Sequence, residues 1–149
     1  MSAVKEWFGA YNIVFRHIRE TYGPKELDKY LKFIADEANS DISDRMRDKP
    51  VKESVKWFAE QFRLDGADIA ISESVAETVI TVRQCAAYDY MNHSTNPFDK
   101  AEEYYCDCCR KLNGRICENA GIRLDISDVN RCGQCRWTFS KEAKRFFDN

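Results

Sequence analysis

The spacing of hydrophobic residues changes near Asp65-Gly66, and this change limits the possible folds more than any other feature of the sequence. Before that point, apolar side chains recur at steps of three and four residues, the spacing of an amphipathic helix. After it, the segments 67–74 and 77–85 alternate apolar and polar residues and are rich in Val, Ile and Thr, as strands are. We therefore expect an α+β fold, with a helical half over 1–64 and a cysteine-rich α+β half over 65–149.

The first half is expected to form about three helices. The first apolar stripe covers 4–22 and ends at Gly23-Pro24, a pair that stops one helix and starts the next. The same periodicity continues over 27–46, and Pro50 begins a third helix over 51–62. Stripes of this kind usually pack into a core, so we expect no binding surface from them.

The second half is expected to build a small antiparallel sheet around a helix that carries cysteines. The two strands after residue 65 are joined by a link short enough for a hairpin. A helix is predicted to start at 97–105 and to run into the cysteines, and a third strand covers 122–126. A turn at 128–133 leads to a fourth strand at 135–139, and a short basic helix at 141–148 closes the chain. The expected order is ααα-ββ-α-ββ.

Composition places limits on the class of protein. The chain has 149 residues, 44% of them hydrophobic, so we expect a single packed domain over 1–149. The net charge of −2 gives no electrostatic footprint for nucleic acid. The N-terminus lacks the pattern of a secretory signal, and no segment approaches the ~20 apolar residues that cross a bilayer. We expect a cytoplasmic protein without membrane or nucleic-acid partners.

Seven cysteines carry most of the functional information in the sequence. In a reducing compartment, clustered thiols bind metal or perform redox chemistry more often than they form structural disulfides. Cys106 and Cys109 form a CxxC on one face of the predicted helix, and Cys132 and Cys135 form another, with 22 residues between the two pairs. Four thiolates suit zinc or an iron–sulfur cluster. We therefore predict a metal site at Cys106, Cys109, Cys132 and Cys135.

Other assignments of the thiols stay open at this point. Cys85 ends a predicted strand, so a second ligand set consists of Cys85, one cysteine of the CDCC run at 106–109, Cys117 and Cys135. A redox dithiol without metal is a further alternative, as is a set of inert buried cysteines. Of the two histidines, His17 is expected beside the core, and His93 is expected in a loop from which it could reach the site.

The second half also resembles a known family. The resemblance rests on three features: a strand that ends in cysteine (VRQCAAY), a helix with cysteines (YYCDCC) and a last strand of the form CRWTF. Over about residues 65–140 this order is similar to the L-2-amino-thiazoline-4-carboxylate hydrolase-like family and the related 4-vinyl-reductase-type domains. The resemblance implies a small α+β domain that binds small molecules or metal; a minority of members are linked to opening a thiazoline ring or to tetrapyrrole metabolism. It places family cysteine positions at Cys85, at one of Cys106, Cys108 or Cys109, and at Cys135.

Three functions follow as hypotheses. The favoured one is a cytoplasmic domain that binds zinc or an iron–sulfur cluster and acts as a small-molecule-binding, sensor or accessory protein. The second is an enzyme, a hydrolase or lyase of a small sulfur or nitrogen compound, with Cys85 as the catalytic residue. The third is a structural zinc domain that mediates protein contacts. A small-molecule ligand and a protein partner or second copy are the partners that these hypotheses allow.

Overall fold

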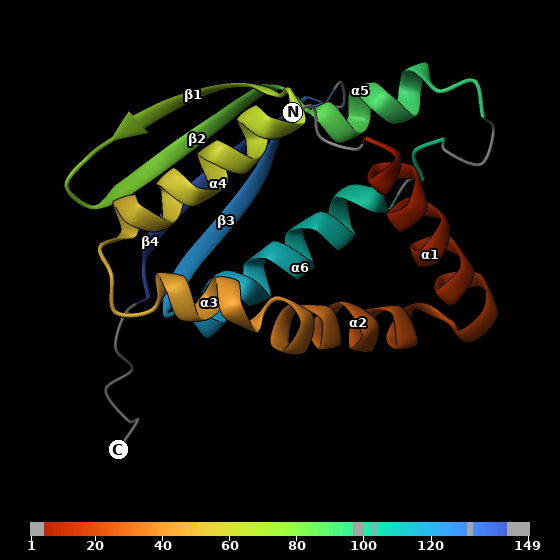
Figure 1. Cartoon of the computed structure of the whole chain (residues 1–149), viewed down its shortest axis with the longest axis horizontal. Helices are drawn as coiled ribbons and strands as arrows, with labels where there is room; N and C mark the ends of the chain where they lie inside the picture. Colours follow the sequence, from red (N-terminus) through yellow and green to blue (C-terminus); the bar gives the residue numbers. More distant parts are fainter. Residues whose placement is uncertain (1–4, 97–99, 103, 131–132, 143–149) are drawn as a thin grey trace.

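The computed structural model describes residues 5–96, 100–102, 104–130 and 133–142 (Figure 1). The helices in chain order are α1 (Glu6–Tyr22), α2 (Pro24–Phe33), the π-helix η1 (Ile34–Ala38), α3 (Ser40–Met46), α4 (Val51–Asp65), α5 (Ala86–His93) and α6 (Tyr105–Asn119). The strands are β1 (Asp68–Glu73), β2 (Glu77–Gln84), β3 (Ile122–Asn130) and β4 (Gln134–Lys141). The predicted α+β class is confirmed.

The strands form an antiparallel sheet in the order β1-β2-β4-β3. One face of the sheet is apolar because alternate residues of neighbouring strands pair across it: Ile80 lies opposite Trp137, and Trp137 lies opposite Ile126. Helices α4 and α6 pack on this face, where Phe58 and Ile116 join the same buried cluster. The other face keeps partly exposed residues, as an antiparallel sheet with one solvated side does.

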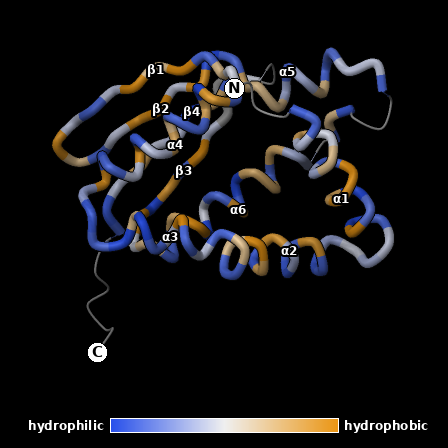
Figure 2. Tube along the Cα trace, in the orientation of Figure 1, coloured by the Kyte–Doolittle hydropathy of each residue, from blue (hydrophilic) through white to orange (hydrophobic). Residues whose placement is uncertain are grey.

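Helix α6 connects this main core to a smaller one formed with α1 and α2 (Figure 1). The smaller cluster contains Phe15, Leu27, Leu31 and Cys108. Leu112 of α6 packs against both clusters. Each turn of α1 and α2 contains both hydrophobic and hydrophilic residues (Figure 2). This spacing gives each helix one apolar side, which makes the contact. The orientation of α6 therefore determines which of its cysteines pack in the main core and which pack in the smaller one.

Two helix boundaries differ from those predicted. The expected helix over 27–46 is divided by η1, where the Asn39 amide nitrogen donates to the Ile34 carbonyl at 3.0 Å. The expected helix start at 97–105 is wrong in its described part, since α6 begins only at Tyr105. The buried side chain of Asn12 accounts for this: it donates to the Lys100 carbonyl and accepts from the Glu102 amide, which holds that backbone outside a helix.

The remaining expectations of the second half are mixed. Strand β3 extends to Asn130, so residues 128–130 of the predicted turn at 128–133 belong to a strand, and 131–132 lie outside the described residues. Helix α5 occupies residues that were expected to be a loop. Of the predicted closing helix at 141–148, Lys141 lies in β4, and residues 143–148 lie outside the described part of the chain.

A network of hydrogen bonds joins η1 to the C-terminal half of α6. The Arg115 guanidinium donates to both Asp36 oxygens, at 2.9 and 3.2 Å, and the Asn119 amide donates to one of them at 2.7 Å. These hydrogen bonds, with Arg115 first, hold the pKa of Asp36 below its ordinary value. The folded state therefore gains stability from ionised Asp36 above the ordinary pKa of an aspartate, and this gain is lost as the pH falls through the lowered value.

We expect Asp36→Asn to lower the denaturant midpoint at pH 7, and to bring the variant and the parent protein together under strongly acidic conditions. Chemical denaturation over a pH series measures this. Asp41→Asn is the matched control, because Asp41 lies 3.8 Å from Arg45 in an exposed pair of little energetic value. A constant difference between parent and Asp36→Asn at every pH would contradict the role given to the Asp36 charge.

Candidate functional site

The first element of the candidate site is the junction between β2 and α5. Cys85 follows β2 directly and is the N-cap residue of α5. Its amide donates to the carbonyl of Gly133 at 2.9 Å, which ties this junction to the start of β4. Cys135, the second residue of β4, lies opposite Val82 in the sheet. Two cysteines 50 positions apart in the sequence, Cys85 and Cys135, thus belong to neighbouring strand ends.

The N-terminal turns of α6 supply the second element. Cys106 lies in the first turn and is exposed, whereas Cys109, one turn further on, is partly buried. Asn113 donates from its amide nitrogen to the Cys109 carbonyl at 2.9 Å and to the Cys109 sulfur at 3.5 Å. The helical spacing puts Cys106 and Cys109 on one side of α6.

The two elements pack against the same main core, to which Cys85, Cys109 and Cys135 all contribute partly buried side chains. Burial raises the pKa of the Cys109 thiol, and negative charge on Cys85, Cys135 and Cys106 raises it further. The pKa of Tyr105 is raised in the same way, first by burial and then by Cys109, Cys85 and Cys106. We call Cys85, Cys106, Cys109 and Cys135 the thiol cluster. Its members come from the β2–α5 junction, from α6 and from β4.

Two members of the thiol cluster lie at helix N-termini. Cys85 is the N-cap residue of α5, and Cys106 lies in the first turn of α6. Thiolates are both the metal-binding and the nucleophilic form of cysteine. The arrangement therefore suits soft-metal ligation and thiol chemistry alike.

The other cysteines have different surroundings. Cys117 is fully buried in the main core, and burial alone raises its pKa to about 12. Cys108 is buried in the smaller cluster beside Phe15 and Leu31, and burial is the first cause that raises its pKa to about 11. Cys108 therefore packs in a different cluster from the rest, whereas Cys117 belongs to the main core against which Cys85, Cys109 and Cys135 also pack. Cys132, one of the predicted ligands, lies outside the described residues.

A close contact between Gly133 and Tyr88 fixes the position of the β4 end of the cluster. Gly133 has a φ of 77°, and a Cβ atom at this position would lie 2.8 Å from Cδ1 and 3.0 Å from Cγ of the Tyr88 ring. Only glycine combines this backbone conformation with such close packing. The glycine of the CGQC motif thus brings the start of β4 against α5, next to Cys85.

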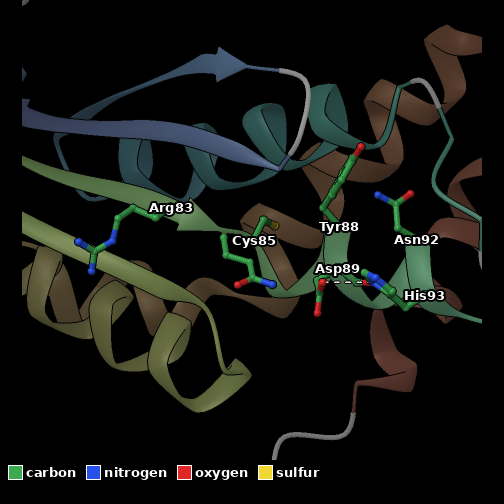
Figure 3. Close-up of a pocket in the computed structure, with 7 residues that line it drawn as sticks. Arg83, Cys85, Tyr88, Asp89, Asn92 and His93 are labelled. Carbon is green, nitrogen blue, oxygen red and sulfur yellow. Dashed lines mark hydrogen bonds and ion pairs between the residues drawn. The ribbon is translucent and has the colours of Figure 1, made fainter.

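A pocket adjoins the thiol cluster on the side of α5 (Figure 3). It is lined by the following residues: Arg83, Gln84, Cys85, Tyr88, Asp89, Asn92 and His93. His93 Nδ1 lies 2.8 Å from the Asp89 carbonyl and 3.2 Å from the Asp89 carboxylate. Arg83 is paired with Asp68 at 2.7 Å. The charged groups are therefore largely compensated within the protein, and the pocket offers polar groups beside the Cys85 thiol.

The two histidines are placed differently from the expectation. His93 is the last residue of α5 and not part of a loop, and it faces Asp89 in the pocket. His17 is exposed on α1, with its ring near Tyr22 and its Nδ1 3.4 Å from the Thr21 hydroxyl. The expected position of His17 beside the core is wrong, because the buried side of α1 is formed by Gly9, Asn12 and Phe15.

Within the described residues, no group of three or more His, Cys, Asp or Glu side chains stands in an arrangement that could hold a metal ion. In the same part of the chain, no helix is long and apolar enough to cross a membrane. The thiol cluster thus has the donor chemistry of a metal site without the compact geometry of an assembled one.

Comparisons with known proteins add little. No family model matches the sequence, and no curated protein matches it. Among solved structures, the chain is similar to a mutant H-NOX protein from K. algicida in its Fe(II), unliganded form, with 9% identity and a TM-score of 0.34. The match covers 98% of this chain and 67% of that protein. At this TM-score the likeness supports no statement about the fold or function of the chain.

Proposed function

We propose that the protein binds a soft metal ion or an iron–sulfur cluster through Cys85, Cys106, Cys109 and Cys135. The observation that supports this most is that Cys85 and Cys135, from the β2–α5 junction and from β4, pack against the same core as Cys109 of α6. Negative charge on these two cysteines and on Cys106 raises the pKa of Cys109. Inert cysteines are expected to be scattered through a core, as Cys117 and Cys108 are.

The chemistry of the donors suits the proposed group. Four thiolates can bind one zinc ion tetrahedrally, and four cysteine thiolates also hold the common iron–sulfur clusters. Since the described side chains are not assembled around a point, the proposal includes a local closure of the thiol cluster on the ion. Such closure couples metal binding to the stability of the fold.

The ligand set proposed here combines the two sets that the sequence left open. Cys106, Cys109 and Cys135 belong to the paired-CxxC prediction, and Cys85 belongs to the alternative. The burial of Cys117 in the main core argues against its use as a ligand. The role of Cys132 as a metal ligand stays a prediction. Substitution of Cys132 and of Cys85, compared directly, tests which of the two binds the metal.

The pocket beside Cys85 supports a role in binding a small molecule at the centre. Its polar side chains could orient a ligand, and Cys85 belongs both to the pocket and to the thiol cluster. This arrangement is suited to a sensor or accessory protein whose metal responds to an incoming molecule. It also favours the resemblance-based alternative, hydrolysis of a small thiazoline, in which Cys85 would be the catalytic residue and the Asp89–His93 pair would lie next to the substrate.

Metal and sulfide analysis tests the proposal on protein purified without oxygen. We expect either about one zinc per chain or iron with acid-labile sulfide and a visible chromophore. Cys109→Ser should lose most of the metal, because Cys109 lies among the other three thiols. Cys85→Ser and Cys132→Ser, compared side by side, identify the fourth ligand.

Cys108→Ser is the matched control, because Cys108 is next to Cys109 in sequence but packs against α1 and α2. It should keep the full metal content. Protein without stoichiometric metal under these conditions would contradict the proposal. Assay of L-2-amino-thiazoline-4-carboxylate hydrolysis separates the alternative: turnover that disappears in Cys85→Ser while the fold survives would support the enzyme.

A further inference from the structure

We propose that Cys106 and Cys109 form an exchangeable dithiol, which reacts with small disulfides and so regulates the proposed metal centre. The inference deepens the proposed function, because both residues belong to the thiol cluster that would hold the metal. Its chemical core, the exchange reaction, is a property of α6 and can be measured on metal-free protein.

The geometry of α6 allows a disulfide between the two residues. Cys106 and Cys109 are three positions apart within a regular helix, Tyr105–Asn119. Helix geometry places Cα atoms at this spacing about 5 Å apart. Disulfides form at Cα separations of roughly 4.4–6.8 Å, so the bond requires rotation of side chains and only a small shift of the backbone.

The two thiols differ in the way an exchange reaction requires. Cys106 is exposed in the first turn of α6, where an incoming disulfide can reach it. Cys109 is less exposed, and its thiol is held by the Asn113 amide at 3.5 Å. The exposed residue is thus placed for attack, and the inner one for the second step.

The reaction balances without a further reagent. The Cys106 thiolate attacks one sulfur of a small disulfide, forms a mixed disulfide, and releases the other half as a thiolate. The Cys109 sulfur, after loss of its proton to solvent, then attacks Cys106 Sγ and releases the second half. Two cysteine thiols are oxidised to one disulfide, and the small disulfide is reduced to two thiols.

Neighbouring cysteines do not offer the same combination. Cys108 is next to Cys109, but its side chain is buried against Phe15 and Leu31 on another side of α6. Cys117 lies in the main core at 0% exposure. Cys85 and Cys135 belong to other elements, so their reaction with Cys109 would require movement of strand ends against α6.

Oxidation and metal binding compete for the same two sulfurs. A thiolate ligand that enters a disulfide can no longer hold a metal ion, and a thiolate bound to metal is protected from exchange. Metal occupancy would therefore follow the thiol–disulfide balance of the surroundings. In this way the centre can report oxidation by releasing its metal.

The experiment uses the full chain, first stripped of metal with a chelator and reduced, and then treated with oxidised glutathione. Trypsin cuts after Lys100 and Arg110, so one peptide, 101–110, carries Cys106, Cys108 and Cys109. We expect this peptide to lose two hydrogen atoms in mass. The same loss in Cys108→Ser assigns the bond to Cys106 and Cys109.

Single substitutions test the order of the steps. Cys109→Ser should stop at a glutathione adduct on Cys106, and Cys106→Ser should slow the loss of thiols in this peptide by about tenfold or more. Cys106 is exposed, so its replacement by serine leaves the packing unchanged. A bond that includes Cys108, or equal reaction rates in Cys106→Ser and the parent, would overturn the inference.

A second arm separates this inference from the proposed function. Pre-incubation of the reduced protein with one equivalent of zinc should block formation of the disulfide. If the disulfide forms in metal-free protein but the chain holds neither zinc nor iron with acid-labile sulfide, the exchange stands and the proposed metal centre fails. If zinc binds stoichiometrically and no disulfide forms after its removal, the metal centre stands and the exchange is overturned.

Discussion

Replacing Phe58 with alanine is expected to cost about 3–5 kcal/mol of unfolding free energy, the usual range for a large aromatic removed from a core. Phe58 is 4% exposed and joins α4 to the sheet. Its ring lies 5.7 Å from the Trp137 ring and 5.4 Å from the Phe139 ring, both on β4. Truncation removes these contacts and leaves a cavity that the surrounding strands cannot fill. Because domains of this size have only about 5–15 kcal/mol of stability, the loss is severe.

Phe33→Ala is the matched control for this substitution. Phe33 ends α2 and is 61% exposed, so the same change in side chain should shift the unfolding free energy by no more than about 0.5 kcal/mol. Urea denaturation followed by tryptophan fluorescence measures both variants, since Trp57 and Trp137 contact or adjoin Phe58. Equal losses in the two variants would show that Phe58 does not anchor α4 on the sheet.

Gly133→Ala adds a single methyl group and is expected both to destabilise the fold and to displace the start of β4 at the candidate site. The backbone φ of 77° costs an alanine about 1–2 kcal/mol. In addition, the new methyl group would meet the fixed part of the Tyr88 side chain at 2.8–3.1 Å, so the start of β4 must move away from α5. We expect this overpacking to add about 1–3 kcal/mol. The hydrogen bond from Cys85 to Gly133 should lengthen, and the Cys85 thiol should become more reactive toward an alkylating reagent.

Gly121→Ala is the control that separates the cost of the backbone conformation from the cost of the contact with Tyr88. Gly121 has nearly the same φ, 75°, but no atom lies within 4 Å of the position of its added Cβ. It should lose only the conformational term and should leave the alkylation of Cys85 and the proposed metal content unchanged. If both variants lose the same stability and Cys85 reacts equally in both, the contact with Tyr88 does not position the site.

The sequence was sufficient for features that depend on neighbouring residues. The helices over the first 65 residues and the hairpin of β1 and β2 follow from periodicity, because the core selects one face of each element. The pairing of Cys106 with Cys109 on one side of a helix is equally local, since three positions make almost one turn. The short helix α5 escaped prediction because polar and apolar residues mix along its eight positions, and its start depends on the contact of Cys85 with Gly133.

The composition of the thiol cluster could not be read from spacing. From the sequence alone we could identify the cysteines, predict which of them share one face of a helix, and expect thiolate chemistry. The tertiary structure brought the strand ends that carry Cys85 and Cys135 together through antiparallel pairing of β2 with β4, and negative charge on both cysteines raises the pKa of Cys109. It also decided that Cys108 and Cys117 are core residues, because α6 packs on α1 and α2 with one side and on the sheet with another. Local pattern therefore determines the elements and their faces, whereas the meeting of distant residues depends on the packing free energy of the whole chain.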